Sequence, residues 1–198
     1  MRIVVFGTGF VGSAIVKELL ARGNDVIPVS RSSEGGGSVL NAGFVAGVTA
    51  GADVIVAALP AAGLADAVAV LVTAAQSSGA RLGVVGGAST IPAHDGEAPE
   101  GDTDVFPERF APLHHGHQAA YAVLEAAPPA VDWFSFVPAG QFGSYKPGTK
   151  TGHYRTSTSS QVKDAAGRSF IGVEDYAIAF ADEVDHPVTH RGWITVGY

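Results

Sequence analysis

The sequence predicts an α/β fold in which helices cover both faces of a doubly wound, mostly parallel sheet. Short apolar runs at residues 3–6, 52–59 and 81–85 have the length and composition of buried parallel strands. Segments with apolar residues at helical spacing lie between them, at 13–22 and 61–78. This alternation is typical of parallel sheets joined by right-handed crossovers.

The first strand and the first helix are joined by a glycine-spaced turn. In such a turn Gly7 permits a sharp bend, Gly9 lets the backbone approach a diphosphate, and Gly12 lets the helix lie close to the strand. The helix N-terminus adds free N–H donors and the positive end of a dipole. The pattern therefore predicts a Rossmann-like dinucleotide site, the alternative being a turn that only packs the helix on the sheet. The expected cofactor-binding residues of this turn are Gly7, Thr8, Gly9, Phe10, Val11 and Gly12.

The residues after the second predicted strand, 24–30, indicate which cofactor binds. An NAD site needs an acidic side chain here for the ribose 2′-hydroxyl, whereas this chain continues with Ser30, Arg31 and Ser32. Arg31 suits a 2′-phosphate through charge-assisted hydrogen bonds that a serine can supplement. We therefore expect Arg31 and Ser32 in the cofactor site, with NADP preferred. Glu34 keeps NAD possible.

The second crossover is less regular than the first. Residues 32–38 have the composition of a flexible loop, and residues 39–50 fit either a short helix or a residual strand. The strand at 52–59 is clearer and is followed by a proline. Because the carboxyl ends of parallel strands face the cofactor crevice, we expect three residues at this exit to lie against the adenosine or ribose: Ala58, Leu59 and Pro60.

Small residues follow the strand at 81–85. Glycines at a strand end allow a nicotinamide or a substrate to approach closely, so Gly86 and Gly87 are assigned to the cofactor site. Ser89 or Thr90 is a candidate hydrogen-bond donor to a substrate carbonyl. A turn that needs only small residues would explain the pattern equally well.

A long acidic segment rich in proline and glycine, 92–112, is expected to form a lid or entrance on the substrate side. Phe106 and Phe110 would be its apolar anchors. A helix is predicted to follow at 118–127.

Three histidines, His114, His115 and His117, precede this predicted helix. Histidines beside a glycine at a helix start are commonly solvated, and no metal-site spacing such as HExxH accompanies them. We therefore expect no metal site. His115 or His117 is a candidate proton donor, because imidazole titrates near neutral pH.

The remaining elements complete one domain, 1–198, in which residues 143–198 contribute a small C-terminal lobe on the substrate side. A strand at 131–138 ends in Pro138, which is placed to meet the nicotinamide. The other predicted elements are short strands at 151–155, 159–162 and 170–171, a helix at 174–184 and a strand at 192–198.

Composition restricts the partners and the compartment. The net charge is −7 and there is no basic tract, which argues against nucleic acid as a partner. No apolar stretch has the length of a membrane span, and the opening run is too short for a signal peptide. The absence of cysteine excludes disulfides and thiolate chemistry. A cytoplasmic enzyme with a small-molecule substrate is expected, as a monomer or homodimer.

Several motifs in the carboxyl half resemble one protein family. They are TGHYR at 151–155, VEDYAIA at 173–179 followed by Asp182-Glu183, and TVGY at 195–198, with VVGGA at 84–88 and Asp132-Trp133 in support. The chain is similar to atypical short-chain dehydrogenase/reductase proteins that are often labelled NAD(P)H-binding or NADH-flavin reductase, with NmrA-like proteins as relatives. The resemblance covers nearly the whole length. It implies a Rossmann-like fold and a nicotinamide cofactor.

Two features depart from the family pattern. The family's glycine turn is usually GATGxxG, whereas this chain has GTGFVG at 7–12. The Tyr-x-x-x-Lys pair of standard short-chain enzymes is missing, because Tyr121 is followed four residues later by Glu125. A carboxylate would raise the pKa of a tyrosine instead of lowering it. A proton-relay alcohol dehydrogenase is therefore not expected.

These observations favour an NAD(P)H-dependent oxidoreductase, with NADPH preferred, that passes hydride to a flavin-like, quinone-like or small carbonyl acceptor. The nicotinamide is expected near Gly87, Ser89 and Pro138, and the acceptor near Tyr121 and Phe142. The candidate catalytic residues are Ser89, Tyr121 and His117. Two alternatives are a non-catalytic NADP-binding sensor of NmrA-like type and an enzyme resembling sugar-nucleotide epimerases.

Overall fold

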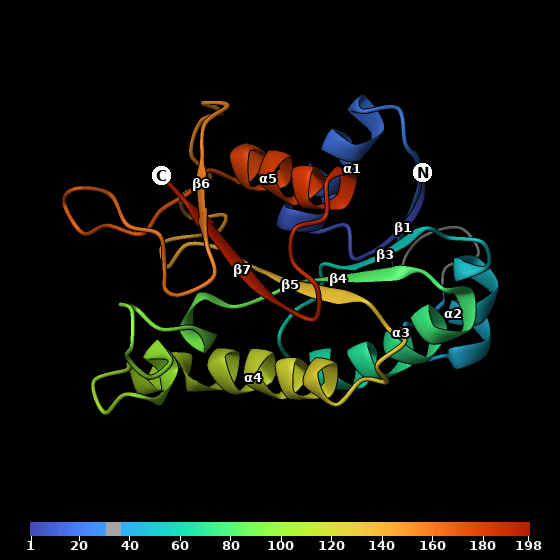
Figure 1. Cartoon of the computed structure of the whole chain (residues 1–198), viewed down its shortest axis with the longest axis horizontal. Helices are drawn as coiled ribbons and strands as arrows, with labels where there is room; N and C mark the ends of the chain where they lie inside the picture. Colours follow the sequence, from blue (N-terminus) through green and yellow to red (C-terminus); the bar gives the residue numbers. More distant parts are fainter. Residues whose placement is uncertain (31–36) are drawn as a thin grey trace.

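The computed structural model describes residues 1–30 and 37–198 and contains a seven-stranded sheet in the order β2-β1-β3-β4-β5-β7-β6 (Figure 1). Neighbouring strands pair in parallel, except that β6 is antiparallel to β7. The strands are β1 (Arg2–Phe6), β2 (Asp25–Val29), β3 (Val54–Ala57), β4 (Arg81–Val85), β5 (Trp133–Val137), β6 (Arg155–Ser157) and β7 (Gly192–Gly197).

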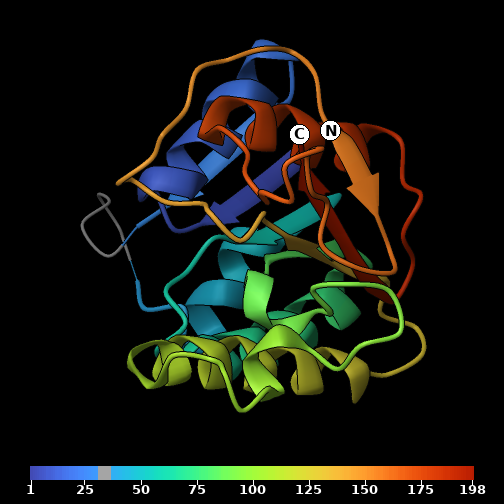
Figure 2. The same cartoon turned by 90° about the vertical axis from the view of Figure 1, so that its left-hand side faces the viewer.

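Helices cover both faces of the sheet (Figure 2). On one face α1 (Phe10–Ala21) packs against α5 (Val173–Asp185), and on the other α3 (Leu64–Ser78) packs against α2 (Ala42–Thr49) and α4 (Ala111–Glu125). Short 3₁₀ helices lie in the connections: η1 (Ala88–Thr90), η2 (Glu100–Asp102) and η3 (Glu108–Phe110). No helix in the described parts of the chain is long and apolar enough to span a membrane. The predicted Rossmann-like, doubly wound α/β fold is confirmed.

The residues of β1 alternate between the two faces of the sheet. Val4 and Phe6 belong to the core under α2, α3 and α4, whereas Ile3 and Val5 belong to the core under α1 and α5. All four are buried. A strand that is buried on both faces needs apolar residues at every position, which is why it has no polar alternation.

The order of strands reverses next to β1. The chain places β2 on one side of β1 and then returns to place β3 on the other side. In open α/β sheets the ligand crevice lies outside the carboxyl ends of the strands at such a point. The exits of β1 and β3 therefore frame the expected crevice.

Two helices clarify or correct the sequence-based expectations. The undecided segment 39–50 contains α2, which Asn41 begins by accepting a hydrogen bond from the Phe44 backbone N–H. Helix α4 begins at Ala111 and not at residue 118. Pro112 lies in its first turn, where the missing N–H would have no partner in any case. The three histidines therefore lie on the helix and not before it.

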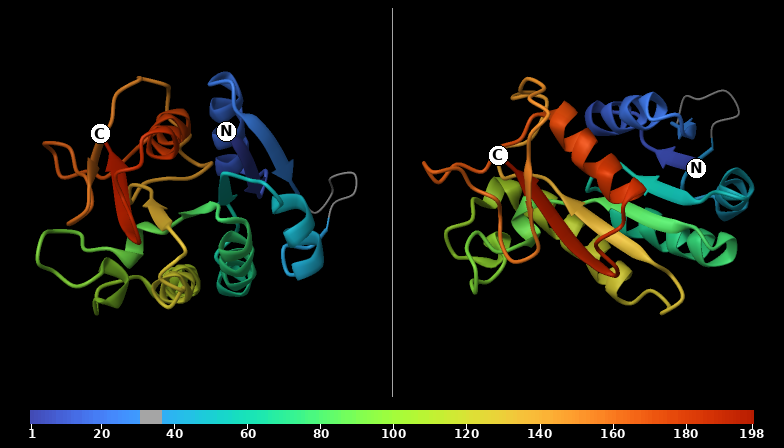
Figure 3. Two further views of the ribbon diagram at one scale, coloured as in Figure 1. Left: turned by 45° about the vertical axis from the view of Figure 1, so that its right-hand side comes forward. Right: turned by 45° about the horizontal axis from the view of Figure 1, so that its top comes forward.

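The carboxyl part of the chain is divided between the sheet and the cleft. Strand β7 lies between β5 and β6, and α5 covers the sheet beside α1 (Figure 3). Of the region 143–198, only the segment before α5 is therefore available to the substrate side. Residues 159–162 form no strand, and Phe170 makes only an isolated bridge with Gln141.

A buried ion pair joins β4 to α5 at the end of the sheet opposite the crevice. Arg81 Nη2 lies 2.5 Å from Glu183 Oε1, with side chains only 10% and 2% exposed. The guanidinium also donates to the Thr189 carbonyl at 2.6 Å, and Glu183 accepts from the Thr189 N–H at 3.1 Å. The guanidinium also pairs with Asp132, whose Oδ2 lies 3.2 Å from Arg81 Nε. Glu183 is thus the more buried of two carboxylate partners, and it would itself be left as an uncompensated buried ion without Arg81.

We expect Glu183→Gln to lower the free energy of unfolding by about 2 kcal/mol, since the buried guanidinium would keep only the more exposed Asp132 as a charged partner. The control is Glu174→Gln on the same helix, whose exposed pair with Lys17 is worth less than about 1 kcal/mol. Chemical denaturation measures both. Equal losses in the two variants would contradict a structural role for the Arg81–Glu183 pair.

Candidate active site

The turn between β1 and α1 brings three backbone segments into contact. Gly7 has a φ of +99°, and a Cβ built on it would lie 2.1 Å from the Ala58 carbonyl oxygen. A Cβ on Gly12 would lie 1.9 Å from the Gly7 carbonyl oxygen. Both positions therefore exclude any side chain, and their absent side chains let the start of α1 close against the exits of β1 and β3. The packing role expected for Gly12 is what the structure shows.

Gly9 is different, because the protein itself does not require a glycine there. Its backbone is extended, with a φ of −75° and a ψ of −161°, and no protein atom lies within 4 Å of an ideal Cβ. It lines a cavity at the N-terminus of α1. The first N–H groups of a helix have no intrahelical partner and attract anions. The turn thus fits the diphosphate of a dinucleotide.

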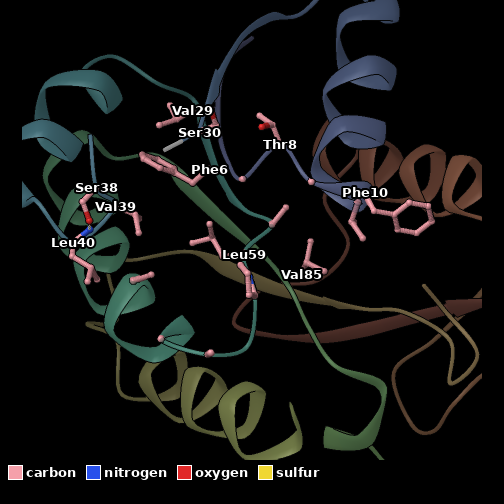
Figure 4. Close-up of a pocket in the computed structure, with 18 of the residues that line it drawn as sticks. Phe6, Thr8, Phe10, Val29, Ser30, Ser38, Val39, Leu40, Leu59 and Val85 are labelled. Atoms are coloured by element: carbon pink, nitrogen blue, oxygen red, sulfur yellow. Dashed lines mark hydrogen bonds between the residues drawn. The ribbon is translucent and has the colours of Figure 1, made fainter. Parts of the chain in front are cut away.

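This first cavity has a volume of about 750 Å³ and lies outside the carboxyl ends of β1, β2 and β3. Figure 4 shows Thr8, Leu59 and Val85 around it, with Ser38, Val39 and Leu40 on its other side. Eight of the predicted cofactor residues line it, namely Gly7, Thr8, Gly9, Phe10, Val11, Ala58, Leu59 and Pro60. Gly12 does not line it.

The end of the cavity near β2 is lined by Ser30, Gly37 and Ser38. No carboxylate lines the cavity among the described residues. Arg31 and Ser32, the predicted 2′-phosphate partners, lie outside the described residues, as does Glu34.

A second cavity of about 900 Å³ continues from the first. Four apolar residues line both, Val11, Leu59, Pro60 and Val85. Gly86, Gly87 and Pro138, which were predicted near the nicotinamide, line the second cavity only. The two cavities form one cleft that runs from the β1–α1 turn to the exits of β4 and β5.

Protein side chains fill the space that Gly86 and Gly87 leave open. A Cβ on Gly86 would lie 2.7 Å from Ser135 Oγ, and one on Gly87 would lie 2.6 Å from His117 Cδ2. The expectation that these glycines make room for a ligand is therefore corrected, because their lack of a side chain accommodates β5 and α4.

His117 lines the second cavity with its ring against Gly87. Burial, with a smaller contribution from His114, lowers the pKa of His117 to about 4. Its Nδ1 is buried and has no hydrogen-bond partner among the described residues. His117 is therefore neutral near pH 7, which argues against its expected role as a proton donor. His115 is exposed and does not line the cavity.

Tyr121 does not contribute to the cleft. Its ring packs edge-on against Trp133 with centroids 5.7 Å apart, and it lies against the core beneath α4. It lines neither cavity. Burial and the nearby Glu125 raise the pKa of Tyr121, so its proton is held more firmly than in water. The hypothesis of a catalytic Tyr121 is therefore corrected.

Ser89 does line the second cavity, and two residues that sequence reasoning did not assign stand behind it. Its Oγ lies 3.2 Å from His114 Nδ1, and His114 Nε2 lies 3.0 Å from Asp102 Oδ1. No sequence spacing identifies this set, because the three residues come from η1, α4 and η2.

Residues from the segment 92–112 and from the segment before α5 form the outer wall of the second cavity. Phe106 and Phe110 line it, as expected for the predicted lid, together with Glu100. Gln161 Nε2 donates to Glu100 Oε2 at 2.7 Å and to the Ala88 carbonyl at 3.2 Å. These bonds hold the two segments together. Lys163 and Arg168, also missed from the sequence, add positive charge to the wall.

The described residues contain no group of three or more His, Asp or Glu side chains that could hold a metal ion.

No protein-family model matches the chain. The protein YwnB of Bacillus subtilis is 32% identical over 108 residues, which make up 54% of this chain and 49% of YwnB. The match thus spans about half the length of this curated relative.

Solved structures match over the whole chain. A "putative exported protein" from Burkholderia pseudomallei is 31% identical with a TM-score of 0.90, and 100% of both chains is covered. A "putative epimerase" from Bacteroides thetaiotaomicron is 31% identical with a TM-score of 0.88, covering 100% of this chain and 96% of the other. A "putative NADH-flavin reductase" from Streptococcus pneumoniae shares the fold, with 24% identity, a TM-score of 0.89 and coverage of 100% and 99%.

The buried neutral His117 predicts a pH dependence of stability. Its pKa of about 4 lies below the usual value of 6.5, so the unfolded chain binds more protons between these two pH values. Stability is therefore complete above about pH 6.5 and falls as the pH drops toward 4. At pH 5 the loss from this group is about 2 kcal/mol.

We expect the difference in unfolding free energy between pH 7 and pH 5 to shrink by about that amount in His117→Gln, and to stay as in the wild type in His115→Gln. Urea titrations at the two pH values measure this. An unchanged difference in His117→Gln would show that His117 is not held neutral by burial.

Proposed function

Because the chain belongs to the atypical short-chain dehydrogenase/reductase family of NAD(P)H-binding proteins, we propose that it is an NAD(P)H-dependent oxidoreductase. Its acceptor is a flavin-like, quinone-like or small carbonyl compound. The observation that carries the proposal is the continuous cleft, which begins at the open Gly9 position and ends in a second cavity lined by Ser89. The name of the Streptococcus relative, an NADH-flavin reductase, supports a redox reaction with a nicotinamide, whereas the name of the Bacteroides relative, an epimerase, supports the alternative.

The residues of the cleft divide the task of holding the cofactor. The turn at Gly7 to Val11 and the first N–H groups of α1 would hold the diphosphate. Val11, Leu59, Pro60 and Val85 would surround the nicotinamide end with apolar surface and exclude water there. A bound nicotinamide supplies or accepts a hydride. The role of the protein's own residues is to hold the acceptor beside the nicotinamide.

The lining of the second cavity indicates the class of acceptor. Four aromatic side chains line it: Phe106, Phe110, Phe142 and Tyr145. Aromatic surface suits a flat conjugated ring. Lys163 adds a positive charge, but Arg168 is paired with Asp164 and Glu100 also lines the cavity, so the charge of the lining does not select an anionic ligand. A classical epimerase mechanism is less well supported, because Tyr121 lies in the core and has no lysine four residues later.

NADPH is the cofactor we propose as preferred. The described lining near β2 offers serines and no carboxylate to the adenosine end, and Arg31 follows directly in the sequence. We also infer a small-molecule substrate, a cytoplasmic location and a monomer or homodimer. The net charge of −7 supports only the absence of nucleic acid among the partners.

The test of the function combines binding and turnover. The purified protein is mixed with NADPH and a panel of flavins, quinones and small carbonyl compounds, and the absorbance of the reduced nicotinamide is followed. We expect turnover above the uncatalysed rate. Gly9→Ala should weaken NADPH binding at least about tenfold, since a methyl group would meet the diphosphate, while stability changes by less than about 1 kcal/mol.

The matched control is Gly47→Ala, at another open glycine position in α2 away from both cavities. It should leave NADPH binding unchanged. Binding without turnover on any acceptor would favour the non-catalytic sensor. Absence of binding, or normal binding by Gly9→Ala, would refute the site.

The cofactor preference is tested with Arg31→Ala. Loss of a charged hydrogen bond to a 2′-phosphate should weaken NADPH binding about 10- to 100-fold and leave NADH binding nearly unchanged. The control is Lys17→Ala, which removes an exposed cation of α1 that pairs with Glu174 of α5. Calorimetric titration with both cofactors measures the affinities. An equal loss for NADPH and NADH would contradict the preference.

A further inference from the structure

We propose that Ser89, His114 and Asp102 form a proton relay that delivers a proton to the reduced acceptor in the second cavity. The inference rests on the proposed function and deepens it, because it favours acceptors that need a proton with the hydride. It assigns a role that no sequence motif indicates to the buried His114 and the exposed Asp102.

The three side chains form a continuous chain of hydrogen bonds. Ser89 Oγ lies 3.2 Å from His114 Nδ1, and His114 Nε2 lies 3.0 Å from Asp102 Oδ1. Gln118 Nε2 donates to the same Oδ1 at 3.2 Å. Both ring nitrogens of His114 therefore have a partner that can exchange or hold a proton.

The solvent exposure of the three hydrogen-bonded side chains changes from Ser89 to Asp102 in the way that a proton relay requires. Ser89 lines the second cavity, His114 is 1% exposed, and the Asp102 side chain is 40% exposed. The His114 ring has no direct access to water, so protons reach its Nδ1 only through Ser89. At the other end the exposed carboxylate compensates a positive charge on the ring.

The His114 ring is fixed in place by its surroundings. A Cβ on Gly101 would lie 2.1 Å from His114 Nδ1, so the ring lies directly on the backbone of η2. The Phe106 ring packs on another side, with centroids 5.7 Å apart. A fixed ring keeps the same nitrogen toward Ser89 through a reaction cycle.

The direction of the ring distinguishes this set from a hydrolase triad. In serine hydrolases the serine meets Nε2 and the aspartate meets Nδ1, so that the serine is activated as a nucleophile. Here the assignment of the two nitrogens is reversed. In addition, the segment 86–90 is a wall of the proposed nicotinamide end of the cleft, where a proton donor is needed.

The proton balance is simple for a carbonyl acceptor. When its carbon gains a hydride, a C–H bond forms and the π electron pair of the C–O bond moves to oxygen. That oxygen takes the hydroxyl proton of Ser89, and Ser89 Oγ takes the Nδ1 proton of the His114 imidazolium. The neutral ring keeps its proton on Nε2, which donates it in a hydrogen bond to Asp102 Oδ1. After the product leaves, water in the cavity returns a proton to Nδ1 through Ser89.

The first test needs no cofactor and no turnover. Proteins with ¹⁵N-labelled histidine are compared by NMR, and the His114 signals are assigned with His114→Gln. At a pH where the ring is neutral we expect the Nε2–H tautomer in the wild type and in Ser89→Ala. Asp102→Asn should lose this preference, because an amide can donate to Nε2. A wild-type ring with Nδ1–H would overturn the relay.

The second test compares two acceptors in one protein. With a carbonyl acceptor we expect kcat to fall at least about 100-fold in Ser89→Ala and about tenfold or more in Asp102→Asn, with KM and NADPH affinity unchanged. With a flavin acceptor, which takes its proton from water, the rates should stay as in the wild type. Asp102→Glu should recover part of the loss, and His153→Gln, at an exposed histidine away from both cavities, should resemble the wild type.

The outcomes separate the relay from the proposed function. Equal carbonyl turnover in the wild type and Ser89→Ala would overturn the relay and leave the oxidoreductase intact. Absence of turnover on every acceptor would refute the function, and the NMR tautomer would still report the His114–Asp102 arrangement. Covalent labelling of Ser89 by a fluorophosphonate, together with ester hydrolysis, would show a nucleophile and overturn the relay.

Discussion

The whole cleft depends on the close approach of three backbone segments that carry no side chain between them. A Cβ atom on Gly7 would lie 2.1 Å from the Ala58 carbonyl oxygen, and a Cβ atom on Gly12 would lie 1.9 Å from the Gly7 carbonyl oxygen. The lack of both atoms leaves room for these oxygens. A methyl group at either position would push the start of α1 away from the exits of β1 and β3. Because α1 also packs on α5, such a shift would extend across that face of the sheet. The helix N-terminus faces the first cavity only as long as these contacts hold.

The parts of the fold that local chemistry decides could be predicted from the sequence. Strands β1, β3 and β4 are buried on both faces, so their apolar runs indicated them directly. The start of α4 was not found in this way, because Gly116 interrupts the helical pattern and Pro112, a favoured first-turn residue, was assigned to the preceding loop. In the structure a Cβ on Gly116 would lie 2.5 Å from the Ala61 carbonyl oxygen. That glycine is explained by a tertiary contact, which no local pattern reveals.

The same distinction divides the candidate site. The cofactor half comes from the exits of two neighbouring strands, and the glycine turn at 7–12 and residues 58–60 were found from the sequence. The acceptor half joins η1, η2, α4 and the loop before α5, which are far apart in the sequence. Ser89 was found because it follows a strand. Its partners His114 and Asp102 were not found. Tyr121 was wrongly placed in the cleft, because the packing of its ring against Trp133 is a tertiary contact that the sequence does not reveal.

The two histidines beside the second cavity show how the surroundings of a side chain decide its chemistry. His114 and His117 lie on the same helix, and the charge of one disfavours charge on the other. Asp102 accepts from His114, whereas His117 faces Gly87 and has an unpaired buried Nδ1 among the described residues. The two histidines thus differ in their partners, because a carboxylate faces the ring of His114 and none in the described part of the chain faces that of His117. The neutral His117 ring therefore packs against Gly87 in the wall of the cleft and supplies no proton. Ser89, backed by His114, is the one group in this wall that we propose as a proton donor.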